Sequence, residues 1–129
     1  MIFSLNIISS PSSQSSHSAY KFAKTLLEEG HSLYRVFFYH DGAYHGSKLT
    51  NPPQDELDIA EEWQELQKQY SVDIVVCIAA GLKRGILDTS EANRYTKEGD
   101  NLRSGFELSG LGQLVDAAAV SDRLVTFGG

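Results

Sequence analysis

The sequence predicts a single-domain α/β fold, a three-layer sandwich around a mainly parallel central sheet. Three observations lead to this prediction. The chain has 129 residues, which is the usual size of one domain with its own core. Strand-like and helix-like segments alternate along it, as in parallel sheets with helices on both faces. Residues 73–80 are apolar almost throughout, which is typical of a central strand covered on both faces.

The first half of the chain contains two predicted strands with a helix between them. Residues 2–8 predict the first strand, and a serine-rich loop at 9–18 follows it. A helix is predicted next by apolar residues at helical spacing, namely Ala19, Phe22, Ala23, Leu26 and Leu27. Gly30 suits the end of that helix. Residues 33–40, rich in aromatic and branched side chains, predict the second strand.

The middle of the chain begins with a loop and continues with a second helix. Glycines and prolines punctuate residues 41–54, where Tyr44 and Leu49 have no obvious place in the core and could meet another subunit. A helix is predicted over 55–70, with Trp63 among its inward-facing residues. Residues 73–80 are the third predicted strand.

The last third predicts two helices and a final strand. A short helix is expected within 87–99, capped by Asp88 or Thr89. Ser109 is expected to cap another helix, and residues 123–128, "RLVTFG", predict the last strand. Internal repeats and linkers are absent from the sequence, so it predicts one domain covering 1–129.

Charge and composition exclude several functional classes. The net charge is −6 and the sequence pI is about 5.1, which disfavours direct binding to nucleic acid. No apolar stretch approaches the roughly 20 residues that cross a bilayer. The first ten residues lack the basic region of a signal peptide, and a single cysteine cannot form an internal disulfide. We therefore expect a cytoplasmic protein.

The single cysteine, Cys77, has two interpretations. Free cysteines are commonly buried and inert, and Cys77 lies in an apolar run. It also lies towards the carboxyl end of a predicted central strand, where α/β proteins place their chemistry. A nucleophilic thiolate needs a cation or free backbone N–H groups nearby, and Lys83 and Arg84 follow closely as candidates to stabilise anionic sulfur. Without a second cysteine, any sulfur that it accepted would leave on another protein's thiol.

Other candidate sites in the sequence are weaker. The four histidines are His17, His31, His40 and His45, and their spacing predicts no metal site. They are best interpreted as solvated loop residues, although His17 or His40 could serve as a proton partner. The serine-rich loop 9–18 could hold the phosphate of a flavin, but a capped, solvated loop explains it as well. The glycines of 109–114, "SGLGQL", fit a tight helix entry. We predict no cofactor and no metal.

Four sequence blocks resemble the DsrE/DsrF-like sulfurtransferases, and within them the TusD-type subunits of sulfur-relay complexes. These blocks are "FFYHDGAYHGSKLTNP" (37–52), "DELDIAEEWQELQ" (55–67), "VCIAAGLKRGILD" (76–88) and "NLRSGFELSGLGQLVDA" (101–117). The resemblance implies a three-layer fold with Cys77 as a persulfide carrier. It implies assembly with TusB-like and TusC-like subunits, as a dimer of heterotrimers. It also implies a TusA-like sulfur donor and a TusE-like acceptor, in a relay that thiolates the wobble uridine of tRNA.

The sequence therefore predicts a sulfurtransferase subunit that carries sulfur on Cys77. Two alternatives stay open. The first is a flavodoxin-like domain that binds flavin through loop 9–18. The second is a non-catalytic assembly subunit, in which Cys77 belongs to the core and the 41–54 loop is an interface.

Overall fold

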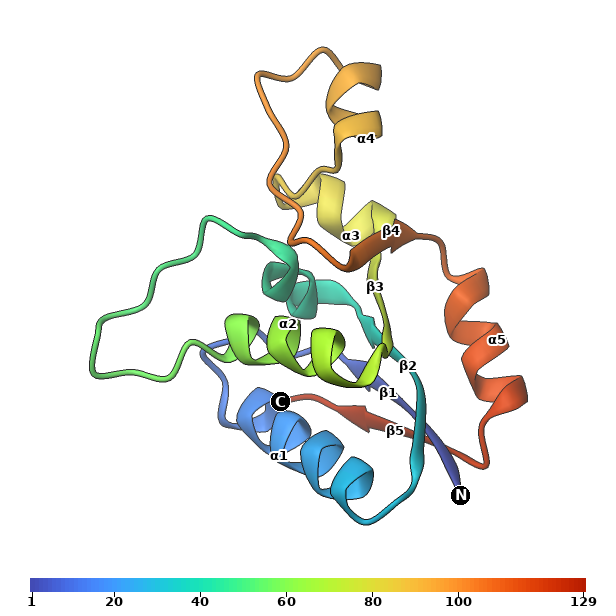
Figure 1. Ribbon diagram of the computed structural model, residues 1–129. Coiled ribbons are helices and arrows are strands. Elements are labelled where there is room, and N and C mark those ends of the chain that lie inside the picture. Colours follow the sequence, from blue (N-terminus) through green and yellow to red (C-terminus); the bar gives the residue numbers. More distant parts are fainter.

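The computed structural model describes all 129 residues and confirms the predicted α/β class. Five strands form one sheet in the order β4-β3-β2-β1-β5, and every neighbouring pair is parallel (Figure 1). The strands are β1 (Ile2–Ile7), β2 (Ser32–Phe38), β3 (Asp73–Cys77), β4 (Phe106–Ser109) and β5 (Arg123–Phe127). No helix has the length and apolar character needed to span a membrane.

Helices cover both faces of the sheet, which makes three layers. On one face lie α1 (Gln14–Glu28) and α2 (Ile59–Tyr70), and on the other lies α5 (Gly112–Val120) (Figure 1). Three short helices follow the carboxyl ends of the central strands. They are the 3₁₀ helix η1 (His40–Gly46), α3 (Ile78–Lys83) and α4 (Thr89–Arg94). Of these, α4 stands farthest from the sheet (Figure 1).

The face under α1 and α2 holds the aromatic part of the core. Trp63 of α2 is fully buried and meets Phe38 of β2 edge to face, with ring centroids 5.7 Å apart. Tyr20 of α1 meets the same indole at 5.4 Å. Such edge-to-face contacts stabilise a core beyond the area they bury. One side chain therefore joins both helices to the central strands, as its predicted inward orientation requires.

The face under α5 is held by a buried cation. Arg35 of β2 donates from Nε to Asp73 Oδ2 at 2.7 Å and from Nη1 to Asp116 Oδ2 of α5 at 2.9 Å. Its Nη1 also donates to the carbonyl oxygen of Gln113 at 2.8 Å. The hydroxyl of Tyr34 and the guanidinium of Arg35 together hold the pKa of Asp116 below its usual value. Because a buried guanidinium must be paired, these bonds fix α5 on the sheet.

Several predicted boundaries were wrong. The third strand ends at Cys77 rather than at residue 80, because the apolar residues that follow form α3. The helix predicted over 55–70 begins at Ile59, where the carboxylate of Asp58 accepts the N–H of Glu61 and caps it. The last helix begins at Gly112 with Leu111 at its N-cap, whereas Ser109 belongs to the unpredicted strand β4. Asp88 caps α4, as predicted.

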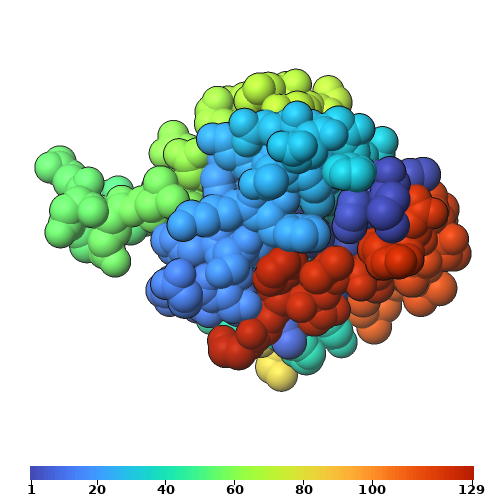
Figure 2. Space-filling view, turned by 90° about the horizontal axis from the view of Figure 1, so that it is seen from below, coloured from blue at the N-terminus to red at the C-terminus, as the bar shows by residue number.

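The 41–54 segment begins with helical structure that was predicted as loop. Residues from His40 to Gly46 form η1, which packs tightly against the end of β1. A Cβ at Gly42 would lie 2.0 Å from the carbonyl oxygen of Ile7, so only glycine fits there. Tyr44 and Leu49 are exposed, as predicted. The residues after η1 leave the body as a long strap, and Figure 2 shows part of it projecting from the molecule.

Candidate functional site

Cys77 lies where the sequence places it, at the carboxyl edge of the sheet. It is the last residue of β3 and the N-cap residue of α3. Its side chain makes no capping hydrogen bond to the helix, so the thiol is not used to start α3. In open parallel sheets this edge is where ligands and reacting groups gather. The position thus satisfies one requirement for a working thiol.

The neighbouring strands define the surroundings of the thiol. Cys77 is opposite Ser109 of β4, and on its other side Val76 is opposite Phe38, so that Tyr39 follows next to Cys77. Because side chains alternate along a strand, Cys77 points to the same face as Val75. That face is the one covered by α5. The thiol therefore lies between the ends of β2 and β4, on the side of the sheet away from α1 and α2.

Cys77 is covered in the isolated chain. Only 2% of the residue is exposed, and it belongs to the main hydrophobic cluster. The thiol is therefore not directly reachable from solvent in the single chain. Exposed residues nevertheless lie close to it: Ala79 is two residues further along the chain, and Gly110 follows Ser109, which is opposite Cys77. Sulfur chemistry at Cys77 requires a local opening of this edge or its remodelling in a complex.

We expect the folded chain to protect its thiol. Ellman's reagent should react at least about tenfold more slowly with the folded chain than with the chain unfolded in urea, because reaction requires a local opening. The release of the coloured thiolate measures both rates, and Cys77 is the only thiol that contributes. Equal rates in the two states would mean that the edge is open in solution.

The two predicted cations lie at the far end of α3 from the thiol. At about 1.5 Å per residue, six residues place the backbone of Lys83 about 9 Å along the axis from that of Cys77. Lys83 is exposed. Arg84 donates from Nε to Asp41 Oδ1 and from Nη1 to the Ala80 carbonyl, both at 3.1 Å. Arg84 thus joins α3 to η1, and a role for either cation at the sulfur stays a prediction.

Of the two histidines considered as proton partners, only His40 lies just beyond the end of a strand that neighbours β3. His40 follows β2, is exposed, and stacks on Tyr39 with ring centroids 4.1 Å apart. Its backbone is left-handed, with φ of 50°. His17 lies instead in α1, on the opposite face of the sheet. The geometry therefore favours His40 over His17 as the group nearer the thiol edge.

His45 was wrongly predicted as a solvated loop residue. It is fully buried and stacks on Phe38 with ring centroids 4.4 Å apart. Nδ1 lies 2.8 Å from the carbonyl oxygen of Gly42 and donates to it, while Nε2 has no partner. Burial is the main cause that lowers the pKa of His45 to about 4; the nearby charge of Arg103 acts in the same direction, and the hydrogen bond to Gly42 opposes it. The imidazole is consequently neutral and structural, and its burial depends on packing that the loop sequence does not reveal.

A second unpredicted feature is the buried guanidinium of Arg103. It donates to the Ser47 carbonyl at 3.0 Å, to Gln64 Oε1 at 3.1 Å and to Thr50 Oγ1 at 3.1 Å. These bonds tie the start of the strap to α2. Its partners Ser47, Gln64 and Thr50 are far from it along the chain, so this structural role could not be found from the sequence.

The serine-rich loop uses its hydroxyls internally. Ser16 Oγ lies 2.7 Å from Ser9 Oγ and donates to the Ser10 carbonyl at 2.7 Å. Ser13 caps α1 by accepting the N–H of Ser15 at 3.1 Å. These contacts fit the capped-loop interpretation and give no support to the flavin alternative. No group of three His, Cys, Asp or Glu side chains has an arrangement suited to a metal ion.

Comparison with known proteins identifies the class to which this fold and thiol belong. Residues 2–127 match the DsrE/DsrF-like family. The chain is 53% identical over 129 residues, covering 99% of each chain, to a protein of Allochromatium vinosum named "Putative sulfurtransferase DsrE". The chain belongs to the DsrE/DsrF-like family.

A solved structure supports the same fold. The crystal structure of the ychN protein from E. coli superimposes with a TM-score of 0.76, covering 98% of this chain and 97% of that one. The two sequences are only 20% identical, so this likeness concerns the fold alone.

Proposed function

We propose that this protein is a sulfurtransferase subunit that carries a persulfide sulfur on Cys77. The observation that carries the proposal is the position of Cys77, the chain's single cysteine, at the junction of β3 and α3. That junction lies at the reactive edge of the sheet in a chain of the DsrE/DsrF-like family. The relative that is 53% identical carries a sulfurtransferase name, which supports the same chemistry.

The transfer requires two displacements at sulfur. In the first, the Cys77 thiolate attacks the outer sulfur of a donor persulfide, a new S–S bond forms, and the donor leaves as a thiolate. In the second, an acceptor thiolate attacks the outer sulfur on Cys77, and the Cys77 thiolate leaves. One sulfur atom moves in each step, and no external oxidant or reductant is needed.

Anionic sulfur at this position would be stabilised by the protein. The first N–H groups of α3 follow Cys77 directly and have no partner within the helix, so they can face a negative charge. We retain Lys83 as the cation that could reach the site by side-chain rearrangement. Arg84 could contribute only after it releases Asp41.

The acceptor and donor must be other proteins, because the chain has no second thiol. We propose the TusD-type arrangement: assembly with TusB-like and TusC-like subunits as a dimer of heterotrimers, a TusA-like donor and a TusE-like acceptor. The start of α5 supports an assembly, since Leu111 just before the helix and Val115 one turn later are exposed on the same side, Val115 at 69%. The proposed end point is the 2-thiolation of wobble uridine in cytoplasmic tRNA.

Cys77→Ser is expected to abolish sulfur acceptance while leaving the fold intact. The purified chain is incubated with a persulfidated TusA-like donor and then weighed by intact-protein mass spectrometry. The unaltered chain should gain the mass of one sulfur atom, which a thiol reductant removes, because the adduct is a persulfide. Circular dichroism of the variant checks that folding is retained. Retention of labelled sulfur by the serine variant would overturn the assignment.

The same variant separates the carrier from the assembly alternative in cells. If Cys77 carries sulfur for tRNA, the Cys77→Ser strain should form a normal complex but lose 2-thiouridine, measured by mass spectrometry of digested tRNA. Normal thiolation with a normal complex would favour the non-catalytic assembly subunit. Loss of labelled sulfur transfer without any change in tRNA would keep the carrier role and reject the tRNA end point.

A further inference from the structure

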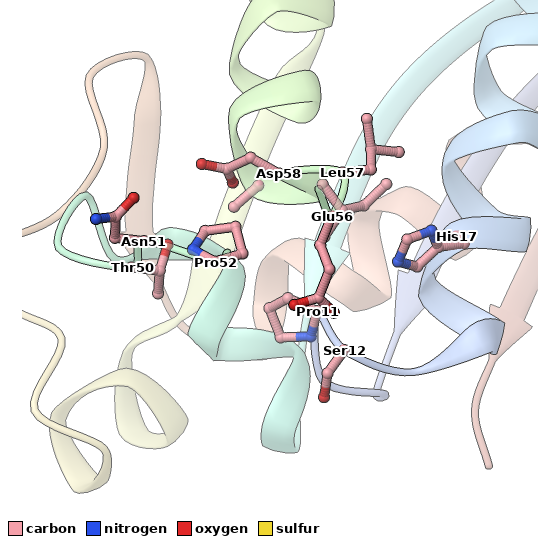
Figure 3. A pocket seen from close by; sticks show the side chains of 11 residues that line it. Pro11, Ser12, His17, Thr50, Asn51, Pro52, Glu56, Leu57 and Asp58 are labelled. Atoms are coloured by element: carbon pink, nitrogen blue, oxygen red, sulfur yellow. The ribbon is translucent and has the colours of Figure 1, made fainter. Parts of the chain in front are cut away.

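A groove lies between the strap and the start of α1, apart from the thiol. It has a volume of about 490 Å³ and is formed by the residues after β1, the first turn of α1 and residues 50–60. Figure 3 shows His17 on one side, Thr50, Asn51 and Pro52 on the other, and Glu56 between them. This volume is within the usual range of protein binding sites.

The groove combines an apolar surface with open access. Ile59 and Ala60 of α2 are almost fully buried and line it, and Pro11 and Pro52 line it from the two loops. Leu57 is 51% exposed at its margin. An exposed leucine beside prolines offers an anchor for an apolar side chain of a partner.

The charged groups that line the groove are mainly carboxylates. Glu56 is exposed and forms no ion pair with any residue of the chain, and the same holds for its neighbour Asp55. Asp58 lies 4.0 Å from Arg103, but that guanidinium is buried and bonded to three other groups. His17 is the only lining residue that can become cationic. The groove therefore complements a positively charged ligand.

We propose that this groove is a docking site for an extended, basic segment of a protein partner. An apolar side chain of the segment lies against Leu57 and Pro52, and a Lys or Arg beside it pairs with Glu56. A peptide suits the site better than a small metabolite, because the groove is open to solvent and its apolar anchor, Leu57, is 51% exposed. The proposal does not rest on sulfur transfer.

The groove and the thiol share one edge of the sheet but lie over opposite faces. The groove is built on the starts of α1 and α2, whereas Cys77 points to the face covered by α5. A segment held in the groove would keep a partner at the carboxyl edge without covering the thiol. Docking and chemistry are thus spatially separate, and each can be tested alone.

Two matched peptides test the proposal on the full chain. The ¹⁵N-labelled protein is titrated with a short blocked peptide of alternating lysine and leucine, and with its counterpart in which glutamate replaces lysine. The basic peptide should shift the amide signals of His17, Asn51 and Leu57 saturably, and the acidic one should not. Shifts of equal size with both peptides, shifts confined to other surfaces, or no shifts up to the solubility limit would overturn the proposal.

Variants then separate the two parts of the contact. Glu56→Gln should weaken binding of the basic peptide about twofold to fivefold, as expected for one exposed charge pair. Leu57→Ser should weaken it by removing the apolar anchor. The control Glu98→Gln removes an exposed carboxylate outside the groove and should leave the affinity unchanged. An equal loss in Glu98→Gln would show a general charge effect and would count against the groove.

Discussion

Replacing Trp63 by alanine should lower the free energy of unfolding by about 3–5 kcal/mol, the usual cost of removing a fully buried large aromatic residue. Trp63 is 0% exposed and is the shared contact of α1, α2 and β2 through Tyr20 and Phe38. Its removal leaves a cavity between the helices and the sheet, at the place where Tyr20 and Phe38 now meet the indole. Urea unfolding followed by far-ultraviolet circular dichroism measures the change, since Trp63 is the only tryptophan and its fluorescence is lost.

Two further variants control this measurement. Trp63→Phe should cost only about 1–2 kcal/mol, because most of the ring packing is kept and the unpartnered Nε1–H is removed. Leu49→Ala, at a position exposed on the strap, should change stability by no more than about 0.5 kcal/mol. A cost below about 1 kcal/mol for Trp63→Ala would contradict its role as the shared contact.

The second large effect is a loss of stability in acid that originates at His45. Burial holds its folded-state pKa at about 4, below the ordinary value of 6.5. Between these two values the unfolded chain binds more protons than the folded chain, so stability falls as the pH decreases from 6.5 to 4. A pKa difference of this size corresponds to a loss of roughly 3 kcal/mol in the free energy of unfolding. Above pH 6.5 the contribution does not change.

The variant His45→Phe isolates this effect from the carboxylates that titrate in the same range. Phenylalanine keeps the ring stacked on Phe38 but cannot take up a proton. Unfolding free energies of the two proteins are compared from pH 7 to pH 4. As the pH falls over this window, the unfolding free energy of the unaltered chain should decrease steadily relative to that of the variant. A difference between the two that stays constant with pH would mean that His45 does not titrate as described.

The parts of the fold that the sequence predicted are those with strong local patterns. The apolar residues at helical spacing predicted α1, and the apolar run around Cys77 predicted the central strand β3. The alternation of strands and helices predicted the parallel sheet. The run did not reveal where β3 ends, because Ile78 and Ala80 suit a buried strand and a buried helix equally. The strand β4 has only four residues and follows a loop, too short a segment to show alternation.

The candidate site was predicted in position but not in environment. Cys77 could be located because it is the only cysteine and lies at a strand end, yet its burial depends on packing around the strand ends that only the fold reveals. The roles of Arg84 and His45 were missed for the same reason, because Asp41 and Phe38 become their neighbours only in the folded chain. The groove at Glu56 gave no sequence motif, since the start of α1 and the strap meet only in three dimensions.

The bonds of Arg35 have a consequence for how this molecule can move. They clamp the second helical layer from Gln113 onwards, and the Ser4–Ser121 hydroxyl contact at 2.7 Å adds to this beyond the end of α5. From Ser109 to Gly112 no side chain donates or accepts a hydrogen bond, so backbone bonds and packing alone hold this stretch, which begins opposite Cys77. Side-chain hydrogen bonds therefore hold α5 from Gln113 to beyond its end, but they do not hold the stretch that leads into it. The stretch without side-chain bonds begins at Ser109, opposite Cys77, so we expect local opening there to expose the thiol first.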